Sequence, residues 1–215
     1  MLMVILLVCF ALFSKSVKQG FMKQADFAVT VKMQDKVSRL GNPTRIARFD
    51  EIMEEAGFFA SPMVSSVAVV VITGIAFIRV KSWKKKIAVL MIPVAFALIV
   101  FGELYGKSVV HHPAPPFFMI KNPTTIFPTY YINEEYSYPS GHAARATFIA
   151  VVIWVVLSPR PGLEREKRKK ILVGVSLVGY AGLISFSRIY LGHHWASDIL
   201  GGVLLGGALA LPSIL

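Results

Sequence analysis

The chain has 215 residues, 55% of them hydrophobic, and its mean hydropathy is +0.62, a composition that excludes an ordinary soluble domain. Its formal net charge of +11 does not indicate a partner nucleic acid, because the basic residues gather in short loops between apolar runs. The single cysteine, Cys9, excludes an intrachain disulfide. We expect one domain over residues 1–215.

The first apolar run, residues 1–13, is short for a transmembrane helix, which needs about 20 apolar residues. Residues 1–17 suffice as a first span if Lys15 and Lys18 extend to the interface. A secretory signal peptide is the alternative, but the run lacks a basic start and a small-residue cleavage site. We therefore expect an uncleaved helix.

The next segment, residues 18–56, is polar and carries charges of both signs. Ile46, Phe49 and Met53 recur at helical spacing within Thr44–Ala56. This pattern predicts an amphipathic helix along the membrane surface. This helix would serve either as a lid that controls the access of lipid or as a linker helix that covers the bundle.

The rest of the chain, residues 57–215, carries the remaining apolar runs and is the expected five-span catalytic core. The predicted fold is therefore all-α: a polytopic six-transmembrane-helix bundle with one extra interfacial helix. The five runs of the core are 57–79, 87–106, 142–157, 171–187 and 197–215.

Charge predicts the orientation of this bundle. The loops 79–86 and 158–170 are strongly basic and fall on the same side if all six segments span. Short basic loops stay cytoplasmic, so both termini are expected inside the cell. The connections 107–141 and 188–196 then lie at the outer, periplasmic face, with four of the five histidines inside them and His142 directly after the first.

The third histidine cluster has the most restrictive spacing. His194 and Asp198 are four residues apart, so on a helix they share a face. The carboxylate can then orient the imidazole, which leaves the other ring nitrogen as a nucleophile. Arg188, after Ser187, offers a planar fork of donors for phosphate oxygens, although an arginine at a span end can also simply reach the interface.

The second cluster, Pro139-Ser140-Gly141-His142, precedes an apolar run. The N-terminus of a helix attracts an anion, Gly141 lets the backbone approach it, and Ser140 adds a donor. His142 at the helix start can protonate a leaving oxygen. The alternative is a plain helix entry followed by an interfacial histidine.

The first cluster starts at Lys107, four residues after Glu103. The two side chains can pair on one helical face, which would aim the ammonium group at a phosphoryl group. The alternative is an interfacial ion pair that contributes little to stability.

Together these residues resemble the type 2 phosphatidic acid phosphatase (PAP2) superfamily of membrane lipid phosphatases. The family motifs are Lys-x6-Arg-Pro, Pro-Ser-Gly-His and Ser-Arg-x5-His-x3-Asp. The second is intact at 139–142, and the third is intact at Ser187, Arg188, His194 and Asp198. The resemblance covers roughly residues 57–208.

The first motif departs from the family pattern, because Ala114 stands where the family has arginine. Loss of one charge-assisted contact costs about 1.5–3 kcal/mol if nothing replaces it. Arg145, one helical turn after His142, is the candidate replacement, since an arginine inside a membrane helix usually faces a polar site. Structural pairing of Arg145 with an acid such as Glu103 is the rival interpretation.

His111, His112 and His193 fit no motif. They can contact phosphate or a lipid headgroup, or group as a metal site. No carboxylate or cysteine shares their spacing and the resembled family works without metal, so we expect no metal and no cofactor.

The resemblance implies hydrolysis of a phosphomonoester or pyrophosphate of a lipid: His194 forms a phosphohistidine, His142 is the acid and Asp198 orients His194. Lys107, Ser140, Gly141 and Arg188 would bind phosphate, with Arg145 as the proposed addition. Candidate substrates are undecaprenyl pyrophosphate, phosphatidylglycerol phosphate and phosphatidic acid, in a membrane that is more consistent with a prokaryote.

Two other classes stay open: a catalytically silent relative that binds phospholipid, motivated by Ala114, and a structural membrane protein. A vanadate-binding haloperoxidase shares the motifs but is soluble. The sequence gives no indication of oligomeric state.

Overall fold

The computed structural model describes residues 1–39, 41–126, 135–157 and 164–214. Helices dominate this part of the chain, whose one isolated β-bridge joins Pro113 and Tyr136, and the predicted all-α class is confirmed. The helices are α1 (Leu2–Lys18), α2 (Lys23–Ser38), α3 (Pro43–Phe58), α4 (Pro62–Arg79), α5 (Trp83–Val89), α6 (Met91–Val110), the 3-10 turn η1 (Phe117–Met119), α7 (Gly141–Leu157), α8 (Glu164–Tyr190), α9 (Ala196–Ala210) and the 3-10 turn η2 (Leu211–Ile214).

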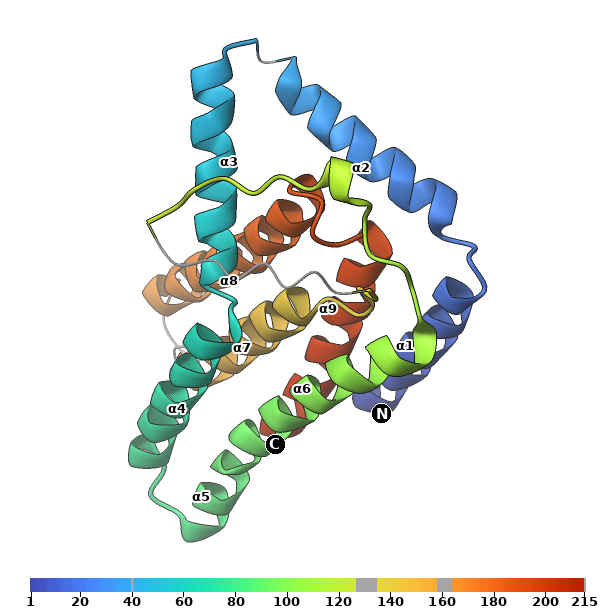
Figure 1. The fold of residues 1–215 in the computed structure, drawn as a ribbon. Coiled ribbons are helices and arrows are strands. Elements are labelled where there is room, and N and C mark those ends of the chain that lie inside the picture. The colour runs from blue at the N-terminus through green and yellow to red at the C-terminus, as the bar shows by residue number, and fades with distance from the viewer. Residues whose placement is uncertain (40, 127–134, 158–163, 215) are drawn as a thin grey trace.

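The helix α7 lies at the centre of the bundle, and α4, α6, α8 and α9 pack around it (Figure 1). None of its described side chains is exposed, and Ala144, Phe148 and Val152 belong to the main hydrophobic core with residues of α4 and α6. A helix that is apolar all round is stable only when other elements cover it. The start of α7, which carries Gly141 and His142, is thereby fixed relative to its neighbours.

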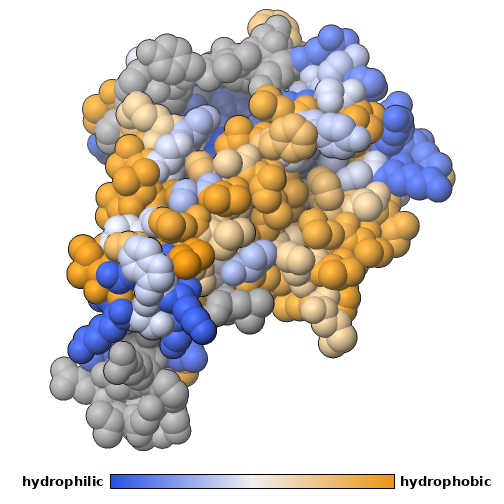
Figure 2. Space-filling model, turned by 90° about the horizontal axis from the view of Figure 1, so that it is seen from below, coloured by the Kyte–Doolittle hydropathy of each residue, from blue (hydrophilic) through white to orange (hydrophobic). Residues whose placement is uncertain are grey.

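Apolar side chains also cover the outside of the bundle (Figure 2). Three described stretches are long and apolar enough to cross a bilayer: Pro62–Arg79, Trp83–Val110 and Arg168–Tyr190. The pair α1 and α2 reaches that length only with a 90° bend between them, and the apolar helices α7 and α9 are shorter. The structure thus supports several membrane helices, while the exact count of six remains a prediction.

The segment 18–56 differs in detail from the prediction of one interfacial helix. It contains two helices, α2 and α3, which form an arch over the ends of α7, α8 and α9 in Figure 1. The helix α2 lacks a clear apolar face, so its sequence pattern gave no signal. The helix α3 is well marked, because Asn42 accepts hydrogen bonds from the N–H groups of Thr44 and Arg45 at 3.0 and 3.3 Å.

Candidate active site

The two motif histidines lie together under the arch. His142 is the second residue of α7, and His194 lies in the turn between α8 and α9. Their ring centroids are 6.2 Å apart at an interplanar angle of 60°. The fold therefore brings the expected nucleophile and the expected acid close to each other.

Asp198 lies in the first turn of α9, where its Oδ2 accepts the N–H of Trp195 at 2.8 Å. A carboxylate at this position stabilises a helix N-terminus, so Asp198 has a structural role as well. The Nδ1 atom of His194 lies 3.6 Å from the same Oδ2, which is within ion-pair range and longer than a hydrogen bond. His194 precedes α9 instead of lying on it, so the two side chains are close together but do not share a helical face as predicted.

His112 is a residue of this site whose role the sequence left open. Its Nδ1 lies 2.9 Å from Asp198 Oδ1, and both side chains are buried. The turn that directs His112 inward is made by His111, which ends α6 in the left-handed region at φ 56°. The sequence feature that could have pointed to His112 was the pair His111 and His112 inside the altered first motif.

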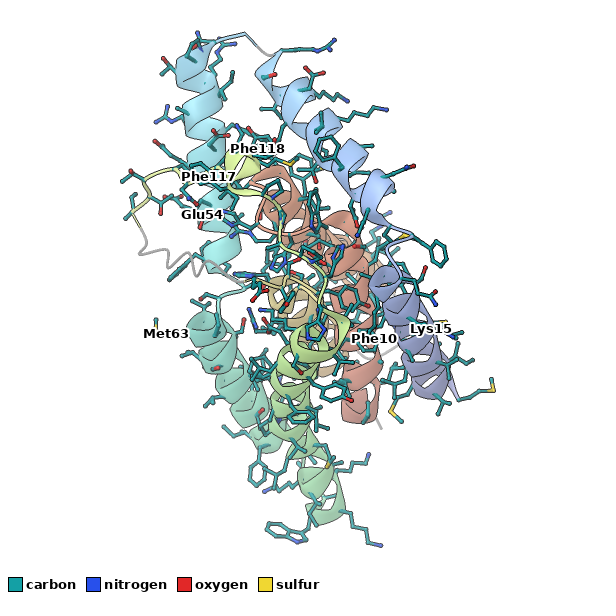
Figure 3. The ribbon with its side chains drawn as sticks, turned by 45° about the vertical axis from the view of Figure 1, so that its right-hand side comes forward. Phe10, Lys15, Glu54, Met63, Phe117 and Phe118 are labelled. Atoms are coloured by element: carbon teal, nitrogen blue, oxygen red, sulfur yellow. The ribbon has the colours of Figure 1, made fainter. Side chains whose placement is uncertain are left out.

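Arg188 is buried, and its guanidinium is surrounded by partners. It donates through Nη1 to His193 Nδ1 at 3.0 Å, and through Nη2 to Glu54 Oε2 at 3.0 Å and the Met53 carbonyl at 3.1 Å. Glu54 is buried on α3 (Figure 3), and nothing in the sequence singled it out. A Cβ at Gly57 would lie 2.0 Å from Arg188 Nη2, so α3 packs directly on this cation.

Glu103 joins the two other cations of the site. Its Oε1 accepts from Lys107 at 3.2 Å, the expected pair, and its Oε2 accepts from Arg145 at 2.7 Å. Arg145 also donates to the Ala60 carbonyl at 3.0 Å. The rival interpretation of Arg145, pairing with Glu103, is therefore observed, and contact with phosphate remains a proposal.

The N-terminus of α7 combines the groups expected of an anion site. A Cβ at Gly141 would lie 2.0 Å from Glu103 Oε2, so glycine is needed here for the carboxylate to approach. Ser140 is buried, and its Oγ accepts the Ala143 N–H at 3.4 Å. Ser140 therefore caps the helix, and its contact with phosphate is a proposal.

The remaining histidines do not gather into one group. The ring of His111 packs on Tyr136 at 4.8 Å, whereas His112 faces Asp198 and His193 faces Arg188. Among the described residues no group of three or more His, Cys, Asp or Glu side chains has metal-binding geometry. Burial, together with Arg188, lowers the pKa of His193 to about 3, so this ring is neutral and accepts from Arg188.

The fold and this site define a membrane-embedded helical protein in which two histidines lie together beside clustered cations. The PAP2 superfamily model matches residues 88–215, more than half of the chain, and the chain belongs to this superfamily.

Relatives and solved structures agree with this assignment. An undecaprenyl-diphosphatase of Sulfolobus acidocaldarius is 32% identical over 133 residues, which cover 60% of this chain and 55% of that protein. Phosphatidylglycerophosphatase B of Bacillus subtilis is 36% identical over 75 residues, 34% of this chain and 35% of that protein. The matched part thus spans about half or less of these curated relatives.

A crystal structure of a transmembrane PAP2-type phosphatidylglycerolphosphate phosphatase from Bacillus subtilis superposes with a TM-score of 0.73, at 21% identity, over 98% of this chain and 93% of that one. A crystal structure of Aquifex aeolicus LpxE superposes with a TM-score of 0.55, at 24% identity, over 87% of this chain and 96% of that one. These likenesses show the fold. With the apolar helices, they identify an integral membrane protein.

Proposed function

We propose that this protein is a lipid phosphatase or diphosphatase that works through a phosphohistidine intermediate. The observation that carries the proposal is the pairing of His142 and His194 at 6.2 Å, with Asp198 behind His194. Family membership and the phosphatase names of the relatives support the same chemistry.

In the proposed reaction the Nε2 of His194 attacks phosphorus in line, because Nδ1 faces Asp198. The bond from phosphorus to the leaving oxygen breaks, and that oxygen takes a proton from His142. Water, deprotonated by His142, then attacks the phosphohistidine and releases inorganic phosphate. Asp198 stabilises the charge that the ring of His194 gains in the first step.

Cations around the two histidines would stabilise the phosphoryl oxygens, which is most of what phosphoryl transfer needs from a protein. Lys107, Arg188 and the start of α7 at Ser140 and Gly141 are the proposed phosphate-binding groups. Arg145 is proposed to replace the arginine missing at position 114, and its distance of 2.7 Å to Glu103 places it beside Lys107. None of these roles needs a metal or an organic cofactor.

The substrate is proposed to be an amphiphile with its phosphate at headgroup level, held at the outer face of a prokaryotic cell membrane with both termini cytoplasmic. Undecaprenyl pyrophosphate and phosphatidylglycerol phosphate are favoured by the names of the relatives, and phosphatidic acid remains a candidate. The basic loop that follows α4 supports this orientation.

A phospholipid-binding protein without catalysis is the second candidate, and Ala114 favours it. Phosphate release from a panel of lipid phosphates by the purified protein in detergent micelles separates the two, with His194→Ala as control. We expect release from at least one lipid phosphate by the wild type and none by the variant. Binding of the same lipids without release would support the silent alternative.

A further inference from the structure

The buried imidazole of His112 lies between two carboxylates that come from different parts of the chain. Its Nδ1 is 2.9 Å from Asp198 Oδ1, and its Nε2 is 3.8 Å from Asp26 Oδ2. His112, Asp26 and Asp198 are 4%, 2% and 0% exposed, respectively. Buried charged groups are costly unless they are paired, so this arrangement needs a reason.

Asp26 is itself fixed from the far side. It accepts the Ser197 N–H at 2.8 Å and the Ser197 hydroxyl at 2.7 Å, which ties α2 to the first turn of α9. The same turn carries Asp198, whose Oδ2 accepts the Trp195 N–H. Three groups thus hold the first turn of α9 and its carboxylate in one orientation: Asp26, His112 and the Trp195 amide.

We propose that His112 is a positioning residue for the nucleophile, backed by Asp26 from α2; this inference rests on the proposed function. With Oδ1 held by His112 and Oδ2 by the Trp195 amide, the carboxylate of Asp198 is fixed toward the Nδ1 of His194, 3.6 Å away. A carboxylate fixed there raises the nucleophilicity of Nε2 and stabilises the ring after attack. The proposed functional unit is the series of contacts that runs from Asp26 through His112 and Asp198 to His194.

Asp26 lies outside residues 88–215, the part matched by the family model. The helix α2 therefore contributes to the nucleophile of this chain through His112, although it brings no residue of the three motifs. A plain arch over the bundle would not need to bury a carboxylate against the first turn of α9.

The test compares His112→Ala with His112→Asn, because the Asn side-chain amide can replace the Nδ1–H donor toward Asp198. His111→Asn is the matched control, since His111 packs on Tyr136 and asparagine tolerates its left-handed backbone. Steady-state rates are measured on the best lipid phosphate, with thermal midpoints for all variants. A charge-assisted hydrogen bond of this kind corresponds to about a ten- to hundredfold change in rate.

We expect His112→Ala to lower kcat about ten- to hundredfold with KM little changed, and His112→Asn to recover most of the rate. His111→Asn should match the wild type. A kcat of His112→Ala equal to the wild type, or equal losses in the alanine and asparagine variants, would overturn the proposal.

Labelling of His194 by diethyl pyrocarbonate, read by mass spectrometry, gives a second readout that needs no turnover. Because the fixed carboxylate makes Nε2 more nucleophilic, His194 should be labelled severalfold more slowly in His112→Ala than in the wild type, His112→Asn or His111→Asn. If the wild type releases no phosphate from any of the lipid phosphates, the proposed function is wrong. Equal labelling in all four proteins refutes the positioning role.

Discussion

At the scale of single residues, the site consists of cations that are each matched by a carboxylate. Glu103 pairs with Lys107 and Arg145, and Glu54 pairs with Arg188. Such pairing offsets part of the cost of burying these charges. A phosphate that enters must therefore compete with, or add to, contacts that already exist.

The missing arginine at position 114 can be tested at this scale. Arg145→Ala should lower kcat/KM about ten- to hundredfold, since one charge-assisted contact to phosphate is lost, and Ala114→Arg should partly restore it in that background. Steady-state kinetics on one lipid phosphate, with thermal midpoints, check both changes. Full activity in Arg145→Ala would contradict the proposal that Arg145 replaces the missing arginine. If Arg145→Ala lowers the thermal midpoint and the added Ala114→Arg does not restore it, the role of Arg145 is limited to its pair with Glu103.

At the scale of elements, α3 is the unexpected contributor. Its residues at helical spacing were visible in the sequence, but they predicted only an amphipathic helix. The buried face also carries Glu54, which bonds Arg188 at 3.0 Å, and Gly57, against which that guanidinium packs. The ion-pair partner of a charged residue on an otherwise apolar face can be identified only from the tertiary structure.

Glu54→Gln removes a negative charge beside Arg188 and keeps an acceptor. We expect inorganic phosphate to inhibit this variant at lower concentration than the wild type, because a dianion no longer competes with the carboxylate. The thermal midpoint should fall, because the buried cation loses its partner.

Glu51→Gln, on the exposed side of the same helix, is the matched control and should change neither quantity. Weaker inhibition of Glu54→Gln by phosphate would mean that Glu54 orients Arg188 for the substrate instead of competing with it.

At the scale of the whole molecule, the family, the all-α class and the membrane character could be predicted from composition and two intact motifs. The proximity of His142 and His194 followed from the order of the helices and their basic loops. The roles of Asp26, His112 and Glu54 could not, because long-range contacts between buried polar groups leave no periodic signal along the chain. The end of α1 at Lys18 agrees with the predicted boundary between residues 1–17 and 18–56, but the helix α2 was not predicted, because it has no clear apolar face.

Orientation in the membrane is the prediction that belongs to this scale. In a Cys9→Ser background, Ser82→Cys tests the basic loop after α4 and Thr124→Cys tests the connection after α6; both positions are exposed. A membrane-impermeant maleimide applied to intact cells should label position 124 and leave position 82 unlabelled until the cells are opened. The reverse pattern would place the site on the cytoplasmic side.

The proposed mechanism requires that His194 carries the phosphoryl group during turnover. Rapid quenching of the wild type with a lipid phosphate labelled in its phosphorus should trap an acid-labile, base-stable phosphoprotein, with the label mapped to the peptide that contains His194. His194→Ala should trap none, and Asp198→Asn should form the species more slowly. Phosphate release by a wild type that forms no such intermediate under any quench condition, or by His194→Ala, would contradict this mechanism.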